Sequence, residues 1–131
     1  MATIFSKIIA REIPAYIVYE DENFLAFLDI NPLKEGHTLV VPKKEVDYIF
    51  DLDDEWLSKM MVFARRVAKG IENVVECKRV GMAVVGLEVP HCHIHLIPIS
   101  KVDDMNFSNG SIKMSEEKFI ELAKKINAAV A

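Results

Sequence analysis

Cysteine, glycine and long apolar runs are all scarce in this chain of 131 residues. It contains two cysteines, five glycines and one tryptophan. Two cysteines, Cys77 and Cys92, are too few for the disulfide framework of a small secreted protein, so we expect free thiols and a cytoplasmic location. No apolar stretch approaches the roughly 20 residues that span a bilayer, so we expect no contact with membranes.

An excess of basic residues is missing as well. The 20 acidic side chains outnumber the 16 lysines and arginines, which gives a net charge of −4. This balance offers no basic surface for a nucleic-acid polymer. Residues 1–7 also lack the basic-then-apolar pattern of a signal peptide. The length suits one domain, and we expect residues 1–131 to form it.

Histidines are few, but three of the four stand close together in residues 90–98, Pro-His-Cys-His-Ile-His-Leu-Ile-Pro. His91, His93 and His95 occupy alternate positions, and alternate side chains of a β-strand share one face. We therefore expect three imidazoles on one face of a strand. Imidazole changes charge near neutral pH and serves as acid, base, nucleophile or metal ligand. The row predicts a reaction site.

A bound metal ion is the main alternative explanation of this row. At about 3.3 Å per residue, His91 and His95 would lie about 13 Å apart along a strand. Zinc holds its nitrogen ligands at about 2.0–2.1 Å, so the three side chains cannot share one ion. Two alternate histidines could bind a metal with help from elsewhere. We expect no metal and keep the two-histidine site as the alternative.

Hydrophobic periodicity predicts an α+β fold. The pattern predicts a short helix from residue 2 or 3 that Pro14 ends, a long helix over 53–75 and a last helix over 115–128. Asp53 and Ser115 are the expected N-caps of the two longer helices. Strands are expected at 15–19, 24–28, 37–42, 79–86 and 90–98. Because the strands cluster as hairpins around one long helix, we expect an antiparallel sheet of about five strands.

Together these segments resemble the histidine triad (HIT) superfamily, and within it the Hint-like branch. Residues 91–97, His-Cys-His-Ile-His-Leu-Ile, are similar to its His-x-His-x-His-x-x motif, in which x is apolar. Residues 3–9, 27–32 and 36–43 are similar to the first half of Hint-like proteins. The resemblance implies a HIT-like fold with one long central helix, a C-terminal helix, and a homodimer whose two sheets join into one.

The resemblance also implies an activity. It implies a nucleotide phosphoramidate hydrolase or nucleotidyl transferase that acts on purine nucleoside 5′-monophosphate conjugates, without a cofactor. His93 would attack the phosphorus and form a nucleotidyl-histidine, and His95 would contact the phosphate and the leaving group. His91 and His37 would support them. The implied nucleotide-binding residues are Asp29, for the ribose hydroxyls, and Ile4, Phe5, Ile8, Phe27 and Ile30, for the base.

Two other functions stay open at this point. One is a nucleotide-binding regulatory module whose activity is incidental, because an intact site does not reveal its cellular role. The other is a dinucleoside polyphosphate hydrolase. The sequence fixes neither the leaving group nor the choice between adenine and guanine.

Two stretches depart from the pattern of relatives. Many relatives carry Gly-Gln-Ser/Thr-Val before the first histidine, whereas residues 86–90 here are Gly-Leu-Glu-Val-Pro. Pro90 has no N–H, and Glu88 would repel a phosphate that it faced. Some bacterial relatives bind zinc through an N-terminal Cys-x-x-Cys. Thr3 and Ser6 stand at those positions here and Glu45 replaces a downstream histidine, so we expect no structural zinc.

Overall fold

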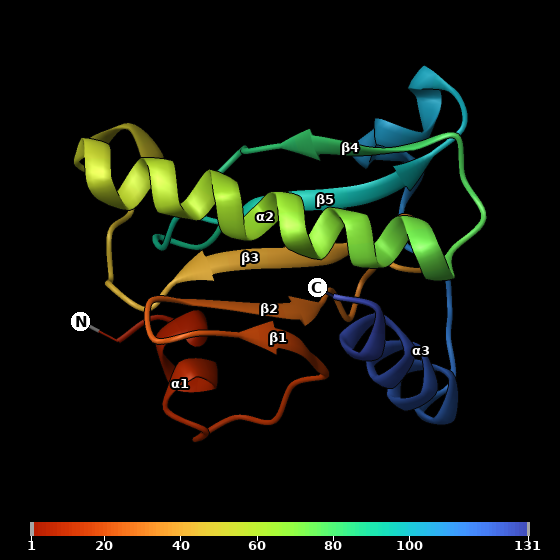
Figure 1. Ribbon diagram of the computed structural model, residues 1–131, viewed down its shortest axis with the longest axis horizontal. Coiled ribbons are helices and arrows are strands. Elements are labelled where there is room, and N and C mark those ends of the chain that lie inside the picture. The colour runs from red at the N-terminus through yellow and green to blue at the C-terminus, as the bar shows by residue number, and fades with distance from the viewer. Residues whose placement is uncertain (1, 131) are drawn as a thin grey trace.

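Five antiparallel strands form one sheet in the computed structural model, which describes residues 2–130 (Figure 1). The strands are β1 (Ile17–Glu20), β2 (Phe24–Leu28), β3 (Thr38–Pro42), β4 (Arg79–Ala83) and β5 (Ile94–Ile99). Their order across the sheet is β1-β2-β3-β5-β4, so β1 and β4 are the edges. The expected α+β fold with five antiparallel strands is confirmed.

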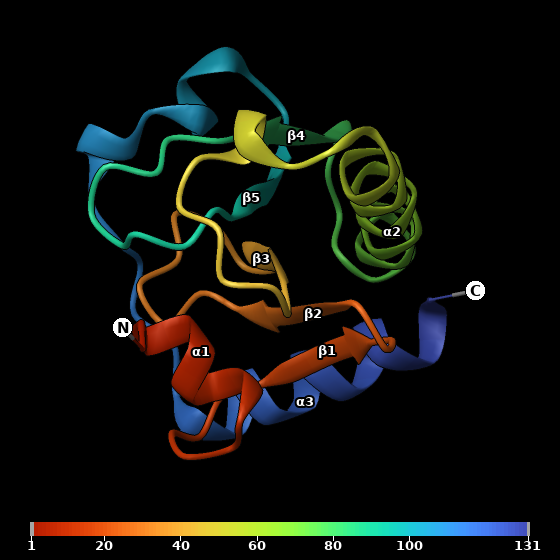
Figure 2. The same ribbon diagram turned by 90° about the vertical axis from the view of Figure 1, so that its left-hand side faces the viewer.

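Two long helices cover one face of this sheet. They are α2 (Asp54–Val74) and α3 (Glu116–Ala129). Between them and the sheet lies the larger core, to which β2 contributes Phe24, Ala26 and Leu28. The strand period of two sends Leu25 and Phe27 to the opposite face, where they pack against Phe5 and Ile8 of α1 (Ile4–Ile9). Figure 2 shows α2 and α1 on opposite sides of the sheet.

The helix starts follow from the expected capping residues. The side chain of Asp53 accepts the backbone N–H of Trp56, and that of Ser115 accepts the N–H of Lys118. The Thr3 hydroxyl accepts the backbone N–H of Ser6, and the Ser6 hydroxyl accepts the backbone N–H of Thr3. Each bond satisfies one of the free N–H groups of a first helical turn. The predicted starts of all three helices are confirmed.

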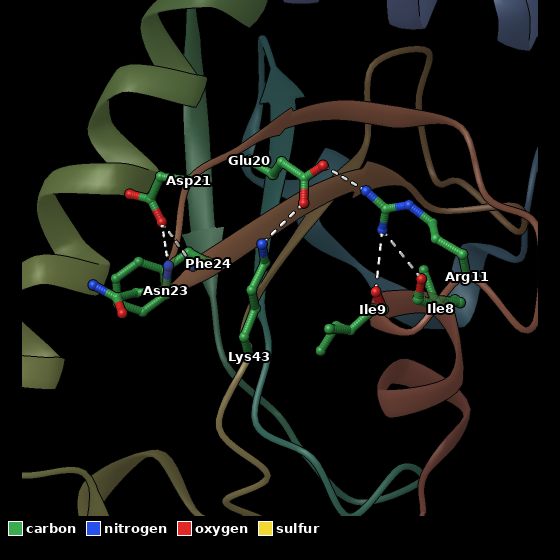
Figure 3. Close-up of polar contacts among 8 residues, drawn as sticks. All are labelled: Ile8, Ile9, Arg11, Glu20, Asp21, Asn23, Phe24 and Lys43. Atoms are coloured by element: carbon green, nitrogen blue, oxygen red, sulfur yellow. Dashed lines mark hydrogen bonds and ion pairs between the residues drawn. The ribbon is translucent and has the colours of Figure 1, made fainter.

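Helix α1 is fastened to the sheet at its C-terminal end (Figure 3). Arg11 has a positive φ of 63°, and its guanidinium donates to the backbone oxygens of Ile8 and Ile9. The same guanidinium pairs with Glu20 on β1, and Glu20 also pairs with Lys43 just after β3. The hydrogen bond from Lys43 lowers the pKa of Glu20, and the positive charges of Lys43 and Arg11 lower it further. The short helix thus lies in a fixed position against the edge of the sheet.

The segments that follow β4 and β5 lie on the same side of the sheet as α1 (Figure 2). After β5 the chain forms two short 3-10 turns, η2 (Val102–Met105) and η3 (Phe107–Asn109). A further 3-10 turn, η1 (Ile49–Asp51), precedes α2. Among the described residues, no helix combines the length and the hydropathy that crossing a membrane requires.

Candidate active site

The histidine row begins before its strand, in contrast to the expectation. β5 starts at Ile94, so of the three histidines only His95 belongs to it. Pro90 has no N–H to give to a ladder. The next two N–H groups bond elsewhere, that of His91 to the oxygen of Val89 and that of Cys92 to the oxygen of Val46. Because these bonds replace strand pairing, the three imidazoles do not form one regular row.

The backbone fixes the tautomer of His93. Its Nδ1 lies 2.9 Å from the carbonyl oxygen of His91, which can only accept, so the proton is on Nδ1 and the lone pair on Nε2. This Nε2 has no hydrogen-bond partner, yet among the described residues no fully buried side-chain nitrogen lacks one. The Nε2 lone pair is therefore accessible. A neutral imidazole in this state is a nucleophile.

A chain of hydrogen bonds gives His95 the opposite tautomer. The N–H of Leu33 donates to Nδ1 of His37 at 3.0 Å, so His37 carries its proton on Nε2. That Nε2 donates to Nδ1 of His95 at 2.9 Å. His95 consequently carries its proton on Nε2, for which the described residues offer no hydrogen-bond partner. The rings of His93 and His95 lie 4.9 Å apart between centroids, so the ring with the free lone pair is next to the ring with the free N–H.

His91 lies behind this pair and is wholly buried. Its Nε2–H donates to the carbonyl oxygen of Pro42 at 2.8 Å, and its Nδ1 accepts the hydroxyl of Thr3 at 2.9 Å. Ser6 and the backbone N–H of Thr3 both donate to Glu45 at 3.0 Å. His91 thus links the histidine segment, the end of β3 and the start of α1. It has no free nitrogen for chemistry.

Burial keeps three of the four imidazoles neutral. It lowers the pKa of His95 to about 3, helped by the nearby His37 and His93. Burial also lowers the pKa of His37, although the carboxylate of Asp29 acts against it. For His91, burial lowers the pKa more than the bond to Pro42 raises it. Neutral imidazoles are what the tautomers described above require.

A cavity of about 470 Å³ opens in front of His93 and His95. The predicted site residues that line it are Ile4, Phe5, Ile8, Phe27, Asp29, Ile30, His93 and His95. Phe5 stands edge-on to His93, 4.9 Å between centroids, so the apolar part adjoins the ring with the free lone pair. His37 and His91 do not line the cavity and instead contact its histidines from behind.

Asp29 makes two contacts at the edge of this cavity. Its Oδ1 accepts the N–H of Asn31 at 2.8 Å and so forms an Asx turn before Pro32. Its Oδ2 lies 3.5 Å from Nε2 of His37. The side chain is 18% exposed, so the carboxylate combines a structural role with access to the cavity.

Asp29, His37 and His95 are close enough to be considered as a metal site, since one ligand atom of each lies within 4.8 Å of the others. The hydrogen bonds argue against it. The N–H of Leu33 occupies the lone pair on Nδ1 of His37, so Nε2 carries a proton and has no lone pair to give. These three side chains therefore suit a hydrogen-bond chain, in which each proton has a defined position, better than they suit a metal ion.

Comparison with known proteins places this geometry in a family. Residues 10–102 match the HIT domain. The chain belongs to the HIT domain family. A HIT-like protein of Borreliella burgdorferi is 37% identical over 132 residues, 95% of each chain. The adenosine 5′-monophosphoramidase of Saccharomyces cerevisiae is 41% identical over 101 residues, 74% of this chain and 62% of that enzyme.

Solved HIT structures agree with the fold. A zinc-bound histidine triad protein of Mycobacterium smegmatis superimposes with a TM-score of 0.85 at 29% identity, over 99% of this chain and 94% of that one. A HIT family hydrolase of Legionella pneumophila is 37% identical with a TM-score of 0.64, over 72% of this chain and 90% of that one. The predicted membership of the histidine triad superfamily is therefore confirmed.

Several residues at the site were not predicted from the sequence, and Phe107 and Thr3 are two that contact its histidines. Phe107 stands edge-on to His95, 4.9 Å between centroids, and lines the cavity. In the sequence, Phe107 stands out only as an aromatic residue in an otherwise polar segment. Thr3 was expected only as the start of a helix, and its bond to His91 spans 88 positions. Contacts of this range depend on the tertiary fold and leave no local pattern.

A second, larger cavity lies away from the histidines. Its volume is about 760 Å³, and it lies among the ends of α2 and β5, the turn η2 and helix α3. Lysines and acidic residues alternate around it, and several pair with one another, such as Lys34 with Asp104. Because positive and negative side chains nearly balance, this cavity does not indicate a ligand of either charge. The histidines with free Nε2 atoms line the smaller cavity instead.

Proposed function

We propose that this HIT protein hydrolyses purine nucleoside 5′-monophosphate conjugates, foremost phosphoramidates, through a nucleotidyl group on His93. The observation that carries the proposal is the pair of free nitrogens at the cavity, a lone pair on Nε2 of His93 beside an N–H on Nε2 of His95. The name of the yeast relative, a monophosphoramidase, supports the choice of substrate type.

The nucleoside would occupy the part of the cavity next to α1. Phe5 and Phe27, 5.6 Å apart, offer aromatic surface for a base, and Ile4, Ile8 and Ile30 add aliphatic contacts. Apolar pockets with a few polar groups are typical of small-molecule sites. The carboxylate of Asp29 is suited to accept hydrogen bonds from the ribose hydroxyls. In this arrangement the 5′-phosphate would lie beside the two histidines.

The reaction then has two halves. Nε2 of His93 bonds to phosphorus as the phosphorus–nitrogen bond to the leaving amine breaks, and the amine departs neutral after taking one proton from solvent through Nε2 of His95. Water next attacks the phosphorus, the bond to His93 breaks, and a proton of that water returns to solvent. The products are the nucleoside monophosphate and the amine. The carbonyl of His91 and the His37 chain would keep both rings oriented throughout.

Cys92 is not a competing nucleophile, although it lies between two site histidines. The thiol is fully buried in the core between the sheet and the helices. Burial raises its pKa to about 11, so the thiolate is absent at neutral pH. An imidazole is left as the nucleophilic group of this segment.

The direct test is the variant His93→Ala assayed with adenosine 5′-phosphoramidate. Turnover is expected to fall by at least about 1,000-fold, because the nucleophile is gone. Nucleotide affinity, measured by calorimetry, is expected to stay within a few-fold because the apolar lining is intact. Turnover within tenfold of the unmodified protein would contradict the proposal. Thermal unfolding of the variant serves as the control for folding.

We also propose that the whole chain acts as one domain in a cytoplasmic homodimer. β4 is an edge of the sheet, and exposed apolar side chains lie on it and directly after it, namely Met82, Val84 and Val85. Edge strands of this kind pair readily with a second copy, which would join two sheets into one. Both cysteines are free, as a reducing compartment requires. Sedimentation of the protein at micromolar concentration tests the dimer.

A further inference from the structure

The cavity contains no positive side chain, although its proposed ligand is a phosphate compound. Among residues 2–130, the residues that line it include Asp29 and Glu88 but no lysine or arginine. Proteins that hold chains of phosphates supply cations to balance their charge. A leaving group that adds a negative charge to the nucleotide would find no such partner here.

Glu88 makes this imbalance stronger. Asp29 is engaged with Asn31 and His37, but no ion pair or side-chain hydrogen bond of Glu88 is found among the described residues. Glu88 lies in the segment between β4 and β5, which departs from the pattern of relatives. This exposed acidic residue therefore lines the cavity with no described cation to offset its charge, which is screened only by solvent.

The same region carries an apolar wall. Leu87 is 89% exposed, Val85 50% and Phe107 43%, yet all three line the cavity. Large apolar side chains gathered in solvent around one opening mark a binding surface. Phe107 contacts His95, whereas Phe5 contacts His93 from the side of α1. The wall thus adjoins the histidine that faces the departing atom in the proposed reaction.

We infer that Leu87, Glu88 and Phe107 select the leaving group, favouring an uncharged amine with an apolar body and disfavouring an anionic one. Leu87 and Phe107 would cover the apolar body, and Glu88 would repel a negative charge. This inference rests on the proposed function and names the part of the substrate that the function leaves open. A dinucleoside polyphosphate, whose leaving group is a charged nucleotide, is a poor substrate in this account.

Two conjugates that differ by one charge test the inference. In the first, adenosine 5′-monophosphate is linked through nitrogen to 2-phenylethylamine, and in the second to the same amine with a para-carboxylate. We expect the unmodified protein to show at least about tenfold higher kcat/KM for the uncharged conjugate. Equal values, or a preference for the carboxylate, would overturn the inference. No turnover of either conjugate or of plain adenosine phosphoramidate would instead overturn the proposed function.

Two variants then assign the effect to residues. Leu87→Ala is expected to lower kcat/KM for the phenylethyl conjugate by about tenfold, through lost apolar contact. Glu88→Lys is expected to raise kcat/KM for the carboxylate by about fivefold, and added salt to reduce that gain. Val102→Ala and Glu76→Lys change equally exposed residues outside the cavity and should leave the ratio between the two conjugates unaltered. An unaltered ratio in both Leu87→Ala and Glu88→Lys would refute the assignment.

Discussion

At the scale of single residues, the site is defined by which nitrogen of each imidazole carries the proton. A backbone carbonyl determines the tautomer of His93. A backbone N–H, acting through His37, determines that of His95. A backbone carbonyl and a hydroxyl together determine that of His91. Every one of these partners is uncharged. The ring of His93 is thus oriented by a carbonyl and not by a carboxylate, whereas the carboxylate of Asp29 lies 3.5 Å from Nε2 of His37.

Thr3 gives a test of this ordering at a residue that does not itself line the cavity. Thr3→Val keeps the shape but removes the hydroxyl that donates to Nδ1 of His91, leaving a buried acceptor unpaired and α1 without its cap. We expect the free energy of unfolding to fall by about 1–3 kcal/mol in urea titrations. We also expect kcat to fall more than KM rises. Thr3→Ser, which restores the hydroxyl, should recover both; failure to recover would count against this role.

At the scale of elements, α1 connects stability to ligand binding. Its N-terminal end is tied through Thr3 and Ser6 to Glu45, and its C-terminal end through Arg11 to Glu20. Between these anchors the helix presents Phe5 to the cavity. A helix of six residues is too short to hold itself together in water, so these ties determine its place.

Loss of the N-terminal anchor should loosen the pocket. Glu45→Ala removes the acceptor of two hydrogen bonds, and we expect nucleotide Kd to rise by about three- to tenfold. Amide hydrogen exchange in residues 4–9 should quicken in the same variant. Glu12→Ala, which removes an exposed carboxylate with no described side-chain partner nearby, is the matched control. Unchanged exchange and affinity in Glu45→Ala would show that the anchor is dispensable.

Elements with local signals were predictable from the sequence, and those set by distant contacts were not. The caps Asp53 and Ser115 and the apolar stripes gave α2 and α3, and turn residues separated the strands. The late start of β5 depends on the bond from Cys92 to Val46, which no local pattern announces. The path that brings Phe107 to His95 is likewise a product of tertiary packing.

At the scale of the whole molecule, the sheet separates the larger core from the candidate active site. One face packs against α2 and α3 and forms the larger core, and the other holds α1, the histidines and the cavity. Three neutral imidazoles are buried on the second face, which the folded protein accepts because each has hydrogen-bond partners. Their burial links the stability of the fold to pH.

The pH dependence has a definite sign. The pKa of His95 is about 3 when folded and about 6.5 when unfolded, so below about pH 6.5 the unfolded chain binds more protons and stability falls with pH. His37 and His91 act in the same direction. Urea titrations between pH 6.5 and 5.5 should show this loss. His95→Gln should reduce the slope in this range by about 1 kcal/mol per pH unit, and an unchanged slope would contradict burial of a neutral His95.

The measurement that addresses the central claim most directly is capture of the covalent intermediate. The protein is mixed with less than one equivalent of adenosine phosphoramidate, quenched within milliseconds in alkaline denaturant, which preserves phosphorus–nitrogen bonds, and mapped by peptide mass spectrometry. We expect one adenylyl group on His93, formed and lost at rates that account for turnover. Turnover without an adduct, or an adduct on His91, His95 or His37 in its place, would contradict the account.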